Sequence, residues 1–219
     1  MTDSRRPLKS RGAGWARALA AGLARTGARP DLISASSVAF ALAGATAFWL
    51  SADAAGWCRF ALLIGAGLCI QLRLLANLLD GMVAVEHGRG GPLGPVWNEL
   101  PDRIADALFL VGAGYALRHL DQDLGPALGW LAAVLAVLTA YIRELGRALG
   151  FEADFAGPGA KPHRMAVLTA GALLAAVGPL WPMGPSVLLL TLGLIVVLAV
   201  ITVVRRTLRL AARLRAASA

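Results

Sequence analysis

Acidic and amide side chains gather around one short connection in the middle of the chain. Near the end of one apolar segment, Asn77 and Asp80 lie three residues apart. Near the start of the next, Asn98 and Asp102 lie four residues apart. These spacings place each pair on one face of a helix, and a short connection makes the two helices antiparallel, so the faces can meet. The pattern predicts an oxygen-rich pocket of the kind that holds Mg²⁺ or Mn²⁺.

Two glycines belong to the same region. Gly81 directly follows Asp80, and Gly94 stands four residues before Asn98. Because glycine has no side chain, it lets a ligand come close to the backbone. We therefore expect a nucleotide to pack against Gly81 and Gly94.

The segments that carry these residues have the composition of a membrane protein. Of the 219 residues, 58% are hydrophobic and 16% are charged, whereas a soluble protein has about 45–50% apolar and about 25% charged residues. Disordered chains, disulfide scaffolds and coiled coils are excluded by this composition. We predict an all-α integral membrane protein with six transmembrane helices, each long enough to cross a hydrocarbon core of about 30 Å. The predicted spans are residues 32–51, 59–79, 95–117, 125–145, 164–181 and 185–204.

Lysine and arginine are distributed unevenly among the connections. Nineteen of the 21 fall in the N-terminal stretch, in or beside the connections after the second and fourth spans, or at the C-terminus. Only Arg59 and Arg118 fall in the remaining connections. By the positive-inside rule the side with nineteen is cytoplasmic, so both termini are cytoplasmic and the number of spans is even. Topology thus explains the net charge of +8, and we expect no nucleic-acid partner.

The charge pattern also divides the chain. Residues 1–30 are predicted to be a cytoplasmic N-terminal segment, residues 31–206 a six-helix transmembrane catalytic domain, and residues 207–219 a basic cytoplasmic tail. Within the first segment, residues 13–27 fit a short amphipathic helix that lies in the membrane interface. An ordinary positively charged flank is an equal alternative for these residues.

The polar cluster resembles the signature of the CDP-alcohol phosphotransferases, also called CDP-alcohol phosphatidyltransferases. That signature, D-x2-D-G-x2-A-R-x8-G-x3-D-x3-D, matches the spacing of this chain throughout residues 77–102. Identity holds at five of the eight positions, which are Asp80, Gly81, Ala84, Gly94 and Asp102. The chain departs from the signature at Asn77, Val85 and Asn98, where the family has Asp, Arg and Asp. A weaker similarity is the Pro-Asp-Leu-Ile-Ser sequence of residues 30–34, where the family often has P-N-x-I-T.

The resemblance implies an enzyme of phospholipid synthesis. Such an enzyme moves a phosphatidyl group from CDP-diacylglycerol, or another CDP-linked alcohol, to a small alcohol acceptor and releases CMP. It implies a multi-pass protein of the bacterial inner (cytoplasmic) membrane whose active site faces the cytoplasm, and it allows a homodimer.

The resemblance also implies roles for the signature residues. Asp80 and Asp102 would bind one or two Mg²⁺ or Mn²⁺ ions, with Asn77 and Asn98 as weaker, neutral ligands. Asp102 would also be the catalytic base. The cytidine would lie against Gly81, Ala84 and Gly94.

Other charged residues could assist this site. Arg143, Lys161, His163 and Arg164 are expected to bind phosphate groups of the substrate or acceptor, and the alternative for them is anchoring at the membrane surface. Glu99 and Asp106 lie beside the signature and could replace part of the lost negative charge. For Asp106, a polar contact inside the helix bundle is the competing interpretation.

Two other functions remain open at this point. The first is a catalytically idle relative that binds lipid, nucleotide or a protein partner, which Asn77, Val85 and Asn98 favour. The second is a small transporter or channel subunit, which six spans would allow. We find no inverted repeat, and the polar residues gather near one surface, which suits an interfacial enzyme better than a pore.

Overall fold

The chain is all-helical. The computed structural model describes residues 13–27, 30–86, 93–120, 123–178 and 186–218, which form seven α-helices. The helices are α1 (Gly14–Arg25), α2 (Pro30–Ser51), α3 (Gly56–Glu86), α4 (Gly94–Tyr115), α5 (Leu124–Ala148), α6 (Lys161–Ala176) and α7 (Ser186–Ala217). The six predicted apolar segments correspond to α2–α7, and the predicted all-α class is confirmed.

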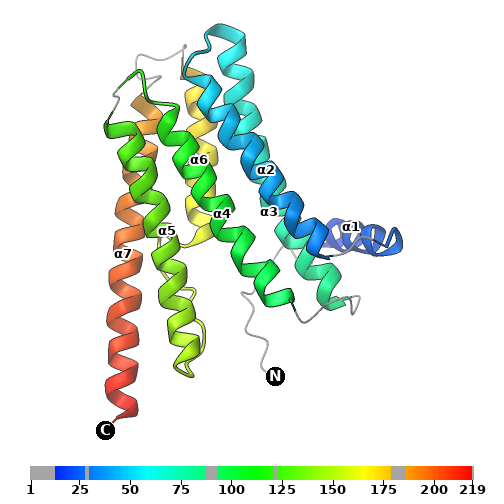
Figure 1. Cartoon of the computed structure of the whole chain (residues 1–219), viewed down its shortest axis with the longest axis vertical. Coiled ribbons are helices and arrows are strands. Elements are labelled where there is room, and N and C mark those ends of the chain that lie inside the picture. The colour runs from blue at the N-terminus through cyan, green and yellow to red at the C-terminus, as the bar shows by residue number, and fades with distance from the viewer. Residues whose placement is uncertain (1–12, 28–29, 87–92, 121–122, 179–185, 219) are drawn as a thin grey trace.

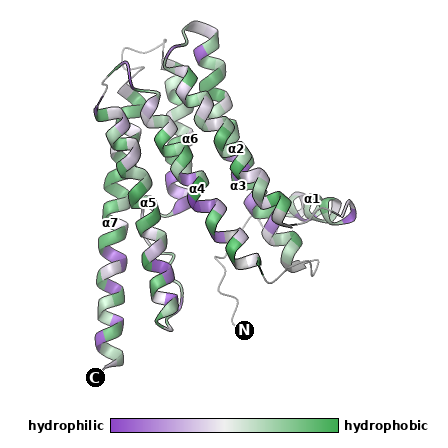
Figure 2. Cartoon of the chain, viewed as in Figure 1, coloured by the Kyte–Doolittle hydropathy of each residue, from purple (hydrophilic) through white to green (hydrophobic). Residues whose placement is uncertain are grey.

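Helices α2–α7 run alternately up and down as a bundle, and α1 lies across the ends of α2 and α3 (Figure 1). The N-terminal ends of α2, α4 and α6 therefore lie at the same end as the C-terminal ends of α3, α5 and α7. We call that end the basic end, because it carries the arginines of the C-terminal half of α7. Purple hydrophilic positions recur along this lower half of α7 in Figure 2.

Four of the described helices are long and apolar enough to cross a membrane: α2, α3, α5 and α7. Helix α4 contains three charged residues within its first half, and α6 has only 16 described residues. The chain is a multi-pass membrane protein, but the count of six spans stays a prediction.

Helix α1 packs on the basic end of α3 through its smallest side chains. Ala16, Ala20 and Ala24 are buried, and they join a cluster with residues of the last turns of α3. Trp15 and Leu19 are about half exposed on the other side of α1. A helix is thus present within the residues predicted to be amphipathic, and Leu23 packs against the cluster while Trp15 and Leu19 lie outside it.

At the opposite end of the bundle, a small group of polar contacts joins the α2–α3 turn to the end of α4. Arg118, just after α4, pairs with Asp53 in the α2–α3 turn, and His119 hydrogen-bonds the same carboxylate at 2.7 Å. The His119 hydrogen bond lowers the pKa of Asp53. The Trp49 ring stacks on Tyr115, with 5.2 Å between the ring centres. These contacts hold the α2–α3 turn to the end of α4.

Helices α4 and α5 approach each other through glycines. A Cβ atom built on Gly114 would lie 2.7 Å from the carbonyl oxygen of Gly125 and 3.0 Å from Cα of Gly129. Backbone atoms cannot move aside as a flexible side-chain end can, so a side chain here must separate the two helices.

We therefore expect Gly114→Ala to destabilise the protein by about 2 kcal/mol, despite the higher helix propensity of alanine. Thermal unfolding in detergent measures this effect as a lowered Tm. Gly65→Ala is the matched control, because no atom lies within 4 Å of its added Cβ. An unchanged Tm for Gly114→Ala would contradict the close helix approach.

Candidate active site

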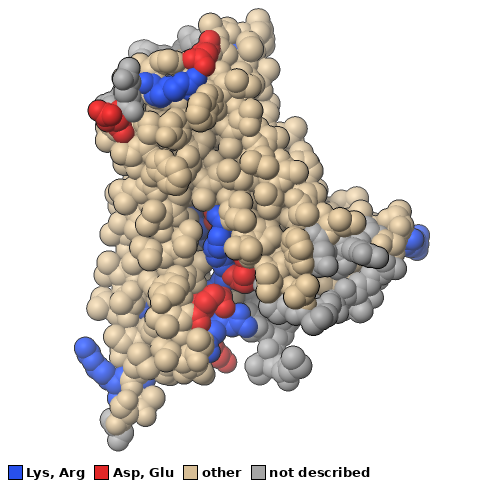
Figure 3. Space-filling model, viewed as in Figure 1, with Lys and Arg blue, Asp and Glu red and all other residues tan. Residues whose placement is uncertain are grey.

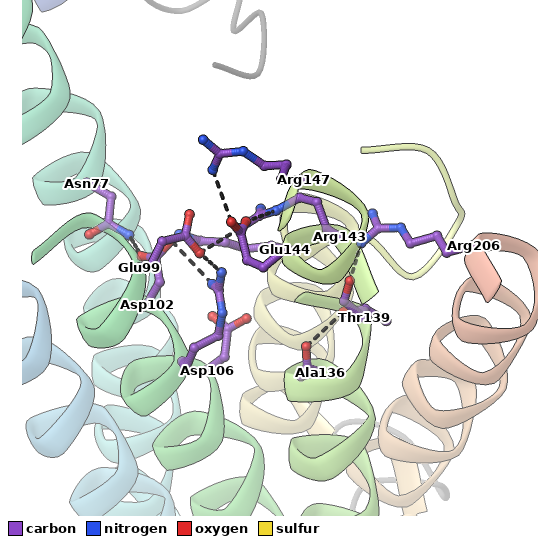
Figure 4. Close-up of polar contacts among 12 residues, drawn as sticks. Asn77, Glu99, Asp102, Asp106, Ala136, Thr139, Arg143, Glu144, Arg147 and Arg206 are labelled. Carbon is purple, nitrogen blue, oxygen red and sulfur yellow. Dashed lines mark hydrogen bonds and ion pairs between the residues drawn. The ribbon is translucent and has the colours of Figure 1, made fainter. Parts of the chain in front are cut away.

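Asn77 and Asp102 join the polar faces of α3 and α4. The Asn77 side-chain amide donates a hydrogen bond to Oδ1 of Asp102. Figure 4 shows these two side chains pointing toward each other from neighbouring helices. This contact was predictable from the helical spacing, since both residues lie near the connected ends of antiparallel helices.

Asp80 is buried one turn further along α3 and is tied to α2. Its Oδ2 accepts a hydrogen bond of 2.6 Å from the Ser34 hydroxyl. Its Oδ1 is buried and has no hydrogen-bond partner among the described residues. Ser34 was not predicted as a site residue, although it lies in the Pro-Asp-Leu-Ile-Ser sequence that resembles a family pattern. A buried carboxylate oxygen without a partner is costly and is normally satisfied by a proton, a water or a cation.

Asp102 is surrounded by positive charge. Lys161 Nζ lies 2.5 Å from its Oδ2, and Arg73 lies 3.4 Å from its Oδ1. Lys161 is the first residue of α6, 59 residues away in sequence. The Lys161 ammonium and the Arg73 guanidinium together balance the charge of the Asp102 carboxylate.

The loop before α6 brings Lys161 to this position. The backbone N–H of Gly159 donates to the Thr202 hydroxyl at 2.7 Å, and its carbonyl accepts from Arg164 at 2.5 Å. A Cβ atom on Gly159 would lie 2.4 Å from the carbonyl oxygen of Leu198. The loop is therefore seated directly on the backbone of α7, and a glycine is required for it to lie so close.

Asp106 lies one turn beyond Asp102 and is buried between two arginines. Arg73 of α3 lies 2.6 Å from one of its carboxylate oxygens, and Arg164 of α6 lies 2.8 Å from the other. Asp106 and Arg164 were predicted from the sequence to be site residues, whereas Arg73 was not. The signal for Arg73 was its position one turn before Asn77 on the same helix face.

A second polar group borders the site toward α5. Glu99 pairs with Arg103 and, at 2.5 Å, with Arg143. Arg143 also pairs with Glu144 at 2.7 Å and lies over the Phe155 ring. Figure 4 shows Glu99 between α4 and Arg143 of α5, and Figure 3 shows charged atoms of both signs gathered in the lower half of this face. Arg143 and Glu99 are thus partly exposed beside Asp102.

The remaining predicted residues take various positions. His163 is exposed, and its Nδ1 lies 3.0 Å from the Pro158 carbonyl oxygen in its own loop. Ala84 is half-buried. No atom of the described residues lies within 4 Å of a Cβ added to Gly81 or Gly94, so both border open space in the described part of the structure. The side chains of Val85 and Asn98 lie outside the described part of the structure.

The oxygen donors at this junction are few. Among the described residues, no three His, Cys, Asp or Glu side chains come together in a way that could hold a metal ion. The donors present are Asp80, Asp102 and the Asn77 amide, and Oδ1 of Asp80 is buried without a hydrogen-bond partner. Hard divalent cations take carboxylate and amide oxygens, so these residues carry donors of the kind that such an ion binds.

An apolar helical bundle with a carboxylate and amide junction at its basic end is the arrangement expected from the resemblance to the CDP-alcohol phosphotransferases. The chain is similar to members of that family, among them phosphatidylinositol phosphate synthases. The synthase of Mycobacteroides abscessus is 25% identical over 192 residues, which are 83% of this chain and 79% of the relative. No family model matches the chain.

Solved structures show the same relationship. The phosphatidylinositol phosphate synthase of Mycobacterium tuberculosis with CDP-DAG bound superposes with a TM-score of 0.74 at 26% identity, over 90% of this chain and 94% of that one. The same enzyme in complex with manganese and citrate superposes with a TM-score of 0.73, over 89% and 88% of the two chains. The fold is thus that of an enzyme that binds CDP-DAG and manganese.

Proposed function

We propose that this chain transfers a phosphatidyl group from CDP-diacylglycerol to a small alcohol and releases CMP. The observation that carries the proposal is the junction of α3 and α4, where Asp102 meets Asn77 and Lys161. The solved relative with CDP-DAG bound supports the choice of donor. The open space beside Gly81 and Gly94 leaves room for the cytidine.

The residues then divide the work. Asp102 accepts the proton of the acceptor hydroxyl. The acceptor oxygen attacks the phosphorus on the lipid side, the phosphorus–oxygen bond to CMP breaks, and CMP departs. A divalent ion held by Asp80, Asp102 and the Asn77 amide, with Asn98 as a further candidate ligand, supplies Lewis acidity toward the pyrophosphate. Because two of the four family carboxylates are asparagines here, we propose one Mg²⁺ or Mn²⁺ ion.

An acceptor that bears a phosphate fits the basic residues beside Asp102. The product for which the relatives are named, phosphatidylinositol phosphate, carries such a group. Lys161 and Arg143 are partly exposed at the site and are the proposed contacts. As the acceptor phosphate takes up the Lys161 ammonium, Oδ2 of Asp102 becomes free for the hydroxyl proton. Arg164 is buried and paired with Asp106, so it supports the site from within.

Membrane placement follows from the same frame. We propose that α2–α7 form the six-span catalytic domain of residues 31–206 in the inner membrane, with the basic end and its site in the cytoplasm. Helix α1 would lie in the interface with Trp15 and Leu19 toward lipid. The basic tail of residues 207–219 begins inside α7, which continues as one helix to Ala217. A homodimer is compatible with this placement.

The test is CMP release by purified protein in detergent with CDP-diacylglycerol and Mn²⁺. The acceptors are serine, glycerol phosphate, inositol and inositol phosphate. We expect release with a phosphorylated acceptor above all. A folded protein that binds CDP-diacylglycerol but releases no CMP with any acceptor would favour the idle relative, with Asn77 and Asn98 as the reason.

Metal removal is a separate prediction. Because the Asp80 and Asp102 oxygens need a cation to act on the pyrophosphate, EDTA is expected to lower CMP release by at least about 100-fold. Added Mg²⁺ or Mn²⁺ should restore it, and Ca²⁺, which is larger, should restore less. Full activity in EDTA after dialysis would contradict the metal assignment.

A further inference from the structure

Arg73 contacts Asp102 in two places from inside the bundle. Its side chain is completely buried. Its Nη2 atom donates a hydrogen bond to the backbone carbonyl oxygen of Asp102 at 2.9 Å and lies 3.4 Å from the carboxylate Oδ1 of the same residue. One guanidinium group thus touches both the backbone and the side chain of the proposed base.

Asp106 holds that guanidinium in place. Nη2 of Arg73 lies 2.6 Å from Oδ1 of Asp106, and Nη2 of Arg164 lies 2.8 Å from Oδ2 of the same aspartate. Arg164 in turn donates to the Thr139 hydroxyl of α5 and to the Gly159 carbonyl of the loop before α6. Arg73, Asp106 and Arg164 thus form a buried ion bridge. This bridge connects the helix that carries Asp102 with the loop that precedes Lys161.

Burying the charged groups of this bridge inside the bundle costs free energy, because the charges lose their contact with water. Three of its nitrogen donors are buried without a hydrogen-bond partner among the described residues: Nε and Nη1 of Arg73 and Nε of Arg164. A buried ion pair contributes little stability compared with apolar side chains of similar volume, and its best-attested use is to select one arrangement. The arrangement selected here is the one that places Asp102 and Lys161 against each other.

We propose that Arg73 and Asp106 are positioning residues for phosphatidyl transfer, with Arg73 orienting Asp102 and Asp106 fixing Arg73. The inference rests on the proposed function. Because neither side chain is exposed, both act through Asp102, and neither contacts the substrate. Their loss therefore affects the turnover step rather than the binding of the lipid donor.

The test compares Arg73→Met, Asp106→Asn and Arg73→Lys with the unmodified protein. We expect the first two to lower kcat by about 10–100-fold, while the KM for CDP-diacylglycerol changes by less than about twofold. Arg73→Lys keeps the charge and should recover about tenfold of the loss. Gln71→Leu is the control, because it removes a polar contact of α3 with Thr169 of α6 (2.8 Å) outside the bridge.

Backbone hydrogen exchange gives a second measure that needs no activity. Because Arg73 binds the Asp102 carbonyl, its loss should raise exchange across residues 98–106 by about tenfold, with α2 unchanged. An unchanged kcat, or an increase in KM at constant kcat, would overturn the positioning role, as would unchanged exchange at 98–106. If the unmodified protein releases no CMP, the proposed function fails, and exchange alone then decides whether the bridge orders the Asp102 segment.

Discussion

Asp102→Asn is expected to lower CMP release by at least about 10³-fold. The amide cannot accept the hydroxyl proton and is a weaker, neutral ligand for a divalent ion. It also leaves the Lys161 ammonium, 2.5 Å from Oδ2 in the parent protein, without its counter-charge. The loss should appear in kcat at saturating CDP-diacylglycerol, because the reacting proton is involved only in the turnover step.

The matched control is Asp53→Asn. Asp53 is also a carboxylate paired with an arginine, but it lies at the opposite end of the bundle. We expect it to keep CMP release within about twofold of the parent, since surface ion pairs contribute little. Asp102→Asn with more than a tenth of the parent rate, in a preparation of equal Tm, would rule out Asp102 as the base.

Gly159→Ala is expected to lower both the stability and the activity of the protein. The added Cβ would lie 2.4 Å from the Leu198 carbonyl oxygen, 2.5 Å from the Leu198 carbonyl carbon and 2.6 Å from the Ala199 nitrogen. All three are backbone atoms of α7, so the loop must lift away. We expect a destabilisation of about 2 kcal/mol, which lowers Tm by about 4–8 °C for a chain of this size.

The same substitution should affect catalysis through Lys161. Lifting the loop breaks the Gly159 hydrogen bonds to Thr202 and Arg164 and withdraws Lys161 from Asp102, so CMP release should fall by about tenfold or more. The control is Gly193→Ala on α7, where no atom lies within 4 Å of the added Cβ. Equal Tm values for the two variants would show that the loop is not seated on α7 as described.

The helices were predictable because apolar length is a local property of the chain. The segment predicted at 125–145 is α5, and the segment predicted at 185–204 begins α7, each within a few residues except where α7 continues to Ala217. The continuation was missed because its arginines read as a tail. The C-terminal part of α7 packs on the loop of residues 151–156, where Arg209 pairs with Asp154 and Arg206 binds the Ala156 carbonyl.

The contact between Asn77 and Asp102 was also predictable. Helical spacing and a short connection constrain where two such faces lie, and neither depends on the rest of the fold. By contrast, the His163 side chain turned to its own loop, and its position next to Lys161 in sequence gave no sign of that. Side-chain direction at a helix start depends on the preceding loop, which is set by packing on α7.

By itself, the sequence determined that this protein is an all-helical membrane protein with carboxylate and amide side chains gathered at its basic end. Apolar length, charge asymmetry and i, i+4 spacing are sufficient for that. Only the tertiary structure decided which lysine and arginine side chains pair with the carboxylates. Lys161 and Asp102 are 59 residues apart, Arg164 and Asp106 are 58 apart, and Arg73 reaches both aspartates from α3. Such partnerships depend on how helices pack, because burying a charge is favourable only where the bundle supplies its opposite.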